Sequence, residues 1–415
     1  MDLKRKIATA IATGAILANA LVPMAYAGTE ITISGNGADS NNDAVVEVEN
    51  DTNVTQSNTA NFDNNIDGDA NTGDNDANEN TGGDVSVKTG DATVNATVNN
   101  SANQNWAEVD CCSNNNLEIK ISGNGADSDN TVNYDNAGRE GNDINIDQHN
   151  YAYFDNDIKY LDAKTGNNDA NENTGGNVEI DTGDASVTVA VTNWANANSA
   201  RVGNGDGGST LSLWILDNGA DSDNDIVVDL ESDVDVHQGN RAHFDNDVDA
   251  DANTGDNDAN ENTGGDVEVT TGDATVDVTV DNMANFNWAD LNCGCLLDDL
   301  TVKVDGNGHN SDNTVNVDLD SDQDADQHNS ADFDNDVKKL DAETGNNDAD
   351  ENTGEGGDPS VDTGDADVTV DVSNSANMNG IGGEGPDWEW PDWDLGGLSI
   401  SISFDLGDLL DALGL

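Results

Sequence analysis

The stretch that decides the fold is NDANENTGGDVSVKTGDATV, which runs from Asn75 to Val94. It recurs three times, as NDANENTGGNVEIDTGDASV from Asn168 to Val187, as NDANENTGGDVEVTTGDATV from Asn257 to Val276 and, in a looser form, as NDADENTGEGGDPSVDTGDADV from Asn347 to Val368. Internal repeats of this kind are structural units that stack or string together. Because a catalytic constellation is usually singular, the fourfold repeat also argues against an enzyme.

A second marker opens each unit, and it contains the glycines Gly37, Gly125, Gly219 and Gly308, which are 88, 94 and 89 residues apart. The marker reads ISGNGADS twice, then ILDNGADS and VDGNGHNS. The chain therefore divides into four units, at 28–116, 117–209, 210–299 and 300–380. Units one and three share ANTGDNDANENTGGD, whereas units two and four share DQHN, FDND and GNNDA, which indicates that a block of two units was duplicated.

Residues 1–27 are typical of a signal peptide. Lys4, Arg5 and Lys6 form a basic region, Ile7 to Val22 is apolar, and Ala25-Tyr26-Ala27 is a small-residue cleavage site. The apolar stretch is short for a membrane-spanning helix of about 20 residues. We expect a secreted chain, extracellular or at the cell surface, without an integral membrane segment after cleavage.

The charge narrows the classes of partner. The chain has 85 acidic and 13 basic residues and a formal net charge of −72. Binding to nucleic acid or to an anionic membrane requires Lys and Arg to displace counterions, so neither partner is expected. A fold with this charge needs cations or salt to offset its self-repulsion. General solubility in a salty habitat and specific binding of divalent cations both explain the charge.

The predicted fold class is all-β. Alternating Val, Thr and Ala, as in Val187 to Val191 and Val276 to Val280, indicate strands, and Gly90 with its counterparts predicts a turn between two of them. The expected architecture is a β-solenoid-like stack of strand–turn–strand rungs around a thin core of Val, Ala, Thr and Asn. The alternative is four tandem β-sandwich modules.

Each unit also carries a polar phrase, such as Gln148-x-Asn150-x-Ala152-x-x-x-Asn156. Inward amides at a fixed register can hydrogen-bond along a stack of strands, whereas outward amides would only be solvated. The phrase resembles curlin-type repeats, whose pattern is Gln-x-Gly-x-x-Asn-x-Ala-x-x-x-Gln. It shares the Asn-x-Ala core and has Asn in place of the final Gln, while the many Asp residues are foreign to that pattern. The resemblance implies a secreted β-solenoid with a structural or adhesive function.

Clusters of Asp and Asn predict calcium as a cofactor, because calcium takes six to eight oxygen ligands and tolerates irregular loops. They resemble Asp-rich calcium-binding repeats only in part. Units two and four have fewer carboxylates at the equivalent places, so we expect the odd units to bind calcium better; plain solvated turns are the alternative. The candidate ligands are Asp67, Asp69, Asn71, Asp74 and Asp76 in unit one, and Asp221, Asp223, Asp225, Asp249, Asp251, Asn253, Asp256 and Asp258 in unit three.

The cysteines fit an exported protein in an oxidising space. Cys111 with Cys112 and Cys293 with Cys295 are disulfide candidates, either as local bridges or paired between the two sites. The five scattered histidines provide neither a triad nor a metal cluster, so no catalytic residue is predicted.

The last part of the chain differs from the repeats. Residues 381–394 are a linker rich in Trp, Gly and Asp, and residues 395–415 form an amphipathic tail that combines a strand pattern, Leu398 to Phe404, with Leu at helical spacing. The tail is expected either to complete a neighbour's sheet in self-assembly or to cap the last unit.

The sequence as a whole predicts a non-enzymatic, acidic, calcium-stabilised repeat protein. Its expected role is structural or adhesive, in a cell-surface layer, a fibre or a biofilm matrix. The alternative is a ligand-binding solenoid for ice or polysaccharide, for which outward rows of Thr such as Thr93 and Thr97 would be needed.

Overall fold

The computed structural model describes residues 6–13, 16–20, 29–47, 51–109, 116–135, 143–203, 210–292, 299–354, 358–382, 393–394 and 399–400. Unit one contains β3 (Thr29–Ser34), β4 (Asn41–Glu47), β5 (Thr52–Asn71), β6 (Val85–Lys88) and β7 (Ala92–Val109). Unit two contains β8 (Asn116–Ser122), β9 (Asp129–Asp135), β10 (Ile144–Lys164), β11 (Val178–Asp181) and β12 (Ala185–Gly203). Unit three contains β13 (Thr210–Leu216), β14 (Asp223–Asn253), β15 (Val267–Thr270) and β16 (Ala274–Asn292), and unit four contains β17 (Asp299–Asp305), β18 (Asp312–Glu343), β19 (Ser360–Asp362) and β20 (Ala366–Ile381).

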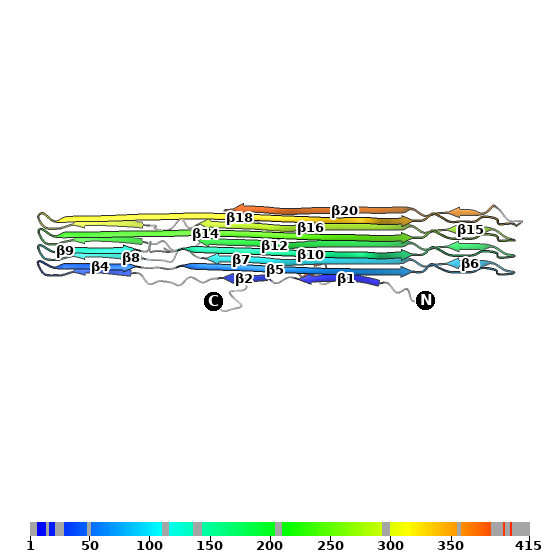
Figure 1. The fold of residues 1–415 in the computed structure, drawn as a ribbon, viewed down its shortest axis with the longest axis horizontal. Coiled ribbons are helices and arrows are strands. Elements are labelled where there is room, and N and C mark those ends of the chain that lie inside the picture. Colours follow the sequence, from blue (N-terminus) through cyan, green and yellow to red (C-terminus); the bar gives the residue numbers. More distant parts are fainter. Residues whose placement is uncertain are drawn as a thin grey trace.

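Each unit forms one rung of a solenoid, and the rungs lie on one another in the order of the sequence (Figure 1). Every strand of the four units pairs in parallel with the same strand of the neighbouring unit; Gln56, for example, registers with Gln148, Gln148 with Gln238 and Gln238 with Gln327. The predicted all-β solenoid is confirmed. The alternative of four separate sandwich modules is excluded, because the sheets are built across units. No helix that could span a membrane occurs in the described residues.

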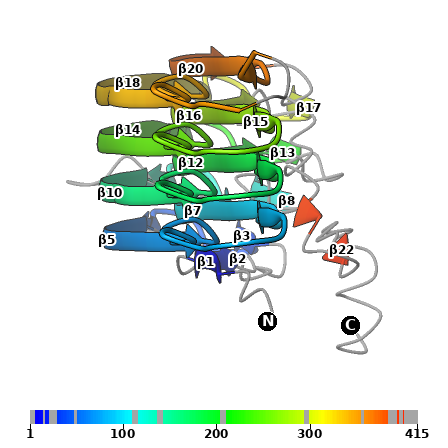
Figure 2. The same cartoon turned by 90° about the vertical axis from the view of Figure 1, so that its right-hand side faces the viewer.

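A rung is a long, flat loop of chain with two layers (Figure 2). The outgoing layer contains β4 and β5, which are fused in unit three into the 31 residues of β14. The returning layer contains β6 and β7, so that Asn64 in β5 faces Asn100 in β7 and Thr72 Oγ1 donates to the carbonyl of Gly90 at 2.8 Å. The predicted turn at Gly90 is therefore a bend within the returning layer, and the chain reverses instead in the loop at 72–84.

The core between the layers is thin, as predicted, and consists largely of Val and Ala. Val187, Val276 and Ala252 are among the fully buried residues of its largest cluster. A separate cluster of Ile and Leu fills the end that contains β8 and β13. The sequence pattern did not predict the column of phenylalanines, whose ring centroids are 4.9, 4.7 and 5.3 Å apart along Phe62, Phe154, Phe244 and Phe333.

Buried amides join the rungs. The Nε2 of Gln148 donates to Gln56 Oε1 at 2.7 Å, and Gln238 donates to Gln148 at 2.8 Å. A second column zigzags between the two layers through hydrogen bonds that link Asn64, Asn100, Asn156, Asn193, Asn246, Asn282, Asn335 and Asn374. The amides point inward, as predicted. Since a buried polar group without a partner costs about 1–3 kcal/mol, this column specifies the register of the stack.

Outside the units, the residues that the structure describes form short strands. β1 (Lys6–Thr13) and β2 (Ile16–Ala20), within the predicted signal peptide, pair in parallel with the edge of β7. β21 (Trp393–Asp394) and β22 (Ser399–Ile400) pair with each other. The remainder of the predicted linker and tail after 382, including the helical part of the tail, lies outside the described residues.

Candidate functional site

The predicted calcium ligands of unit one do not converge on a point. Asp67, Asp69 and Asn71 occupy alternate positions of β5 and are exposed, while Gly68 and Ala70 between them are buried. Side chains two residues apart on a strand are separated by about 7 Å, so the three stand in a line on the outer face. Asp249, Asp251 and Asn253 occupy the same face of β14 in unit three.

Asp74 lies in the reversal loop with a left-handed φ of 56°. Its carboxylate accepts hydrogen bonds from Asn167 Nδ2 at 2.5 Å and Asn71 Nδ2 at 2.6 Å, and Lys164 Nζ lies at 3.3 Å. The hydrogen bond from Asn167, followed by that from Asn71, lowers the pKa of Asp74. In unit three, Asn253 Nδ2 donates to Asp256 at 3.1 Å in the same way. The carboxylates of Asp74 and Asp256 thus already accept hydrogen bonds from asparagine amides.

Carboxylates of the same position in successive units form rows across the rungs. One row contains Asp69, Asp162, Asp251 and Asp341, and another contains Asp76, Asp169, Asp258 and Asp348. Neighbouring strands are about 4.8 Å apart, so like charges lie close together. Burial, with the charges of Asp162 and Asp341 next in importance, raises the pKa of Asp251 to about 6. Burial and then the neighbouring carboxylates also raise the pKa of Asp169 and Asp258.

The third predicted cluster lies at the opposite end of the rung. Asp221 has a φ of 56° in the turn before β14, and its backbone N–H donates to the carbonyl of His309 at 2.9 Å. Asp223 stands in a row with Asp129 and Asp312, and burial, then Asp225 and these neighbours, raises its pKa. Asp225 follows two positions further along the strand. The cluster is therefore another stack of carboxylates.

These residues do not form a calcium loop of the predicted kind. Calcium takes six to eight oxygens around one centre. In the part of the chain that the structure describes, no three His, Cys, Asp or Glu side chains are grouped so that they could hold a metal ion. The rows offer pairs of carboxylates on adjacent rungs, which suit loose, multiple association of cations. All four cysteines lie outside the described residues.

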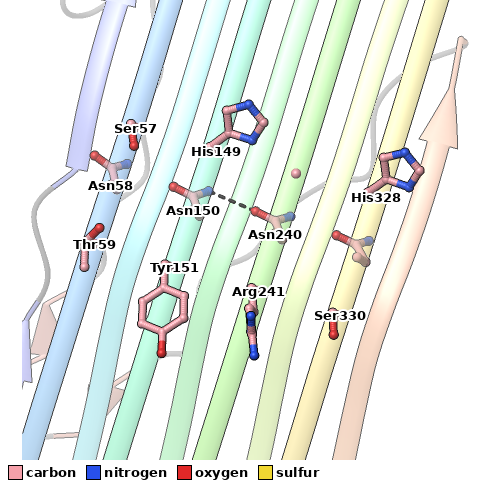
Figure 3. Close-up of a pocket in the computed structure, with 12 residues that line it drawn as sticks. Ser57, Asn58, Thr59, His149, Asn150, Tyr151, Asn240, Arg241, His328 and Ser330 are labelled. Carbon is pink, nitrogen blue, oxygen red and sulfur yellow. Dashed lines mark hydrogen bonds between the residues drawn. The ribbon is translucent and has the colours of Figure 1, made fainter.

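A shallow groove on the outer face of the long sheet is the candidate ligand site, and the sequence reasoning missed it. It has a volume of about 320 Å³ and crosses all four rungs. Figure 3 shows His149 and His328 along one side and Tyr151, Arg241 and Ser330 along the other. The His149 ring lies close over Gly239, because a Cβ on Gly239 would be only 2.7 Å from His149 Nδ1.

The chemistry of this groove differs from that of the acidic surface around it. Histidine, arginine and tyrosine can hydrogen-bond to hydroxyl or carboxylate groups, and the Tyr151 ring, which is 40% exposed, offers a stacking face. The signal in the sequence was positional: His149, Gly239 and His328 each follow the ladder glutamine, so they are brought together once the rungs are in register.

Comparison with known proteins gives no match, whether with family models, with curated proteins or with solved structures.

Proposed function

We propose that this chain is a non-enzymatic, secreted structural or adhesive protein of a cell surface, an extracellular fibre or a biofilm matrix. The observation that carries the proposal is the unbroken zigzag of asparagine amides from Asn64 to Asn374, which is fully buried from Asn100 to Asn282. Polar side chains in the interior are used to hold rung to rung, which is the requirement of a rigid scaffold. The outer face is acidic and the predicted leader directs export.

Immunogold labelling of the source cells tests this proposal. Antibodies raised against the chain should place gold on the outer surface or in the surrounding matrix, and deletion of the gene should reduce surface attachment or cell aggregation. Gold confined to the cytoplasm, or unchanged attachment in the deletion strain, would overturn the proposal.

Calcium enters the proposal as an ion that associates with the carboxylate rows. Divalent cations on adjacent rungs would offset the repulsion along Asp69, Asp162, Asp251 and Asp341. Far-UV circular dichroism during thermal unfolding tests this, because calcium should raise the midpoint and chelator should lower it. Magnesium serves as the control for general screening. An unfolding midpoint that changes with neither calcium nor chelator would contradict a role for calcium.

A polysaccharide-binding solenoid is the second candidate function, and the groove beside Gly239 favours it. An ice-binding role is not supported by the rows on β7, since Thr93 registers with Ser186 and then Thr275 and Asp367. Glycan arrays followed by calorimetry test the groove. Tyr151→Ala or Arg241→Ala should weaken binding at least tenfold, whereas Tyr160→Ala, which removes an exposed tyrosine outside the groove, should leave it unchanged. Equal binding by all the variants would exclude the groove.

A further inference from the structure

The upper face of unit four and the lower face of unit one carry complementary hydrogen-bonding groups. The backbone N–H of Asn75 donates to Asn168 Oδ1, that of Asn168 to Asn257 Oδ1, and that of Asn257 to Asn347 Oδ1, each at 3.2 Å. The donor always lies in the lower rung and the acceptor in the rung above. The upper face therefore presents the N–H of Asn347 as a donor, and the lower face presents Asn75 Oδ1 as an acceptor.

The turn at the other end of the rung repeats this polarity. Asn36 N–H donates to Asn124 Oδ1 at 3.2 Å, Asn124 N–H to Asn218 Oδ1 at 3.2 Å and Asn218 N–H to Asn307 Oδ1 at 3.1 Å. The glutamine column runs in the opposite direction, so that Gln327 presents an acceptor at the top of the stack. At each of these positions, one end of the molecule presents a hydrogen-bond donor and the other end presents the matching acceptor.

Two columns of glycine point to the same partner. A Cβ on Gly73, Gly166 or Gly255 would lie 1.8–2.0 Å from the carbonyl oxygen of the glycine above it, so only glycine fits between rungs. Gly345 is the top member of this column, and a Cβ on it would meet nothing within 4 Å. In the second column the Cβ positions point downward; a Cβ on Gly125 would lie 2.4 Å from Ala38 N, and one on Gly37 would meet nothing. Gly345 and Gly37 are thus glycines at the two end faces, where a Cβ would fit within a single copy of the chain.

The upper face also exposes apolar side chains that the internal rungs bury. Val368, Val370 and Val372 are 42, 47 and 39% exposed, whereas their partners in unit three, Val276, Val278 and Val280, are fully buried. Leu300, Val302 and Val304 are exposed to a similar extent. Exposed apolar patches of this kind mark interaction surfaces.

We propose that a second copy of this chain stacks head to tail on the first, with its unit one on unit four. The contact would repeat the junction between units two and three, in which an odd unit also lies above an even one. A heterologous contact that does not close produces an open filament. The inference rests on the proposed structural function and names its partner.

The predicted leader would regulate this contact. Through β12 and β16, the register places Val368 to Ser375 in the column of Val94 to Ser101. β1 pairs Lys6 to Thr13 with those same residues of β7. β1 therefore lies where the incoming β20 would pair, and removal of residues 1–27 frees the edge.

Sedimentation velocity and negative-stain electron microscopy of the secreted chain, with its N-terminus verified by mass spectrometry, test the proposal. Wild-type protein in calcium-containing buffer should form filaments. Gly345→Ala blocks the upper face and Gly37→Ala the lower face, and each should raise the concentration needed for assembly by about 100-fold. An equimolar mixture should stop at a dimer, because the first variant keeps an intact lower face and the second an intact upper face.

Thr314→Ala, on the outer face of unit four and outside the groove, is the matched control and should assemble like wild type. Unchanged circular dichroism and unfolding midpoints would show that the glycine variants fold. Wild-type protein that stays monomeric at every concentration and salt, or glycine variants that assemble like wild type, would overturn stacking. A monomer that still labels the cell surface would overturn stacking alone, whereas filaments from a protein absent from the surface would overturn the proposed function alone.

Discussion

Val278 in the third rung and Val370 in the fourth hold the same place in the repeat, yet the first is fully buried and the second is 47% exposed. Their neighbours along the strand are also closely similar. The difference comes from the rung above, which the third rung has and the fourth lacks. The apolar side chains of a solenoid rung are therefore buried as much by the neighbouring rungs as by the other residues of the same rung.

This comparison predicts that the same substitution lowers the free energy of unfolding more in an internal rung than in the fourth rung. Phe154→Ala should lower the free energy of unfolding by about 4 kcal/mol, because the ring is fully buried and stacks on Phe62 and Phe244. Phe333→Ala, whose partly buried ring lies tilted against Phe244, should cost about half as much. Urea unfolding of monomeric protein measures both. Equal losses of unfolding free energy would contradict the idea that the fourth rung is packed against a neighbour on one side only.

The amide column gives the next largest contrast. Asn193 donates to Asn246 and Asn282 and accepts from Asn100 and Asn156, so Asn193→Ala leaves buried groups without partners and should cost about 3 kcal/mol. Asn374→Ala at the exposed end removes an acceptor for Asn282 and Asn335 and should cost about 1 kcal/mol. Hydrogen exchange of the adjacent strands should show the same order. A loss at Asn193 no larger than that at Asn374 would mean that the column adds little to stability.

The glycine column tests the spacing of the rungs. Gly166→Ala would place a Cβ 1.8 Å from the Gly255 oxygen and should destabilise the monomer by about 2 kcal/mol. Gly345→Ala meets open space and should leave the monomer unchanged. Thermal unfolding at a concentration below assembly separates the two. A tolerated Gly166→Ala would show that the rungs can move apart locally.

The smallest effect concerns charge. Because the pKa of Asp251 in the folded chain, about 6, lies above its ordinary value of 3.8, the folded form takes up a proton first as the pH falls. Stability should therefore rise as the pH is lowered from 7 through 6 toward 4. Asp251→Asn should stabilise the chain at pH 7 by less than about 1 kcal/mol and reduce this pH dependence, and Asp341→Asn in the end rung should do less. A stability that falls between pH 7 and pH 5 would contradict the repulsion along the row.

Several features of the fold could be predicted from single positions of the repeat. Gln148, Asn150 and Asn156 were expected to point inward, and they do, because alternation along a strand fixes the face of each side chain. The place of the chain reversal could not be predicted, since a Gly-Asp pair such as that at Gly90 suits a bend as well as a hairpin. The groove was missed because His149, Gly239 and His328 become neighbours only when three units are stacked.

The calcium ligands show the same limit. Asp67, Asp69 and Asn71 are close in sequence, and this spacing suggested a loop that surrounds an ion. In a strand, however, their side chains extend in a line, and the carboxylate registered with Asp69 is that of Asp162 in the rung above. The type of residue could be read from the sequence, but the shape of the site depended on the backbone conformation.

The sequence by itself determined the number of units, their length and the all-β class, because local alternation and a repeat of about 90 residues are both visible in a single chain. Only the tertiary structure decided that each unit is one rung, that carboxylates form rows and that the two ends are complementary. The physical reason is that these features arise from parallel pairing between residues about 90 positions apart, such as Gln56 with Gln148. Backbone hydrogen bonds and buried amides fix that pairing, and it brings together side chains that no local pattern relates.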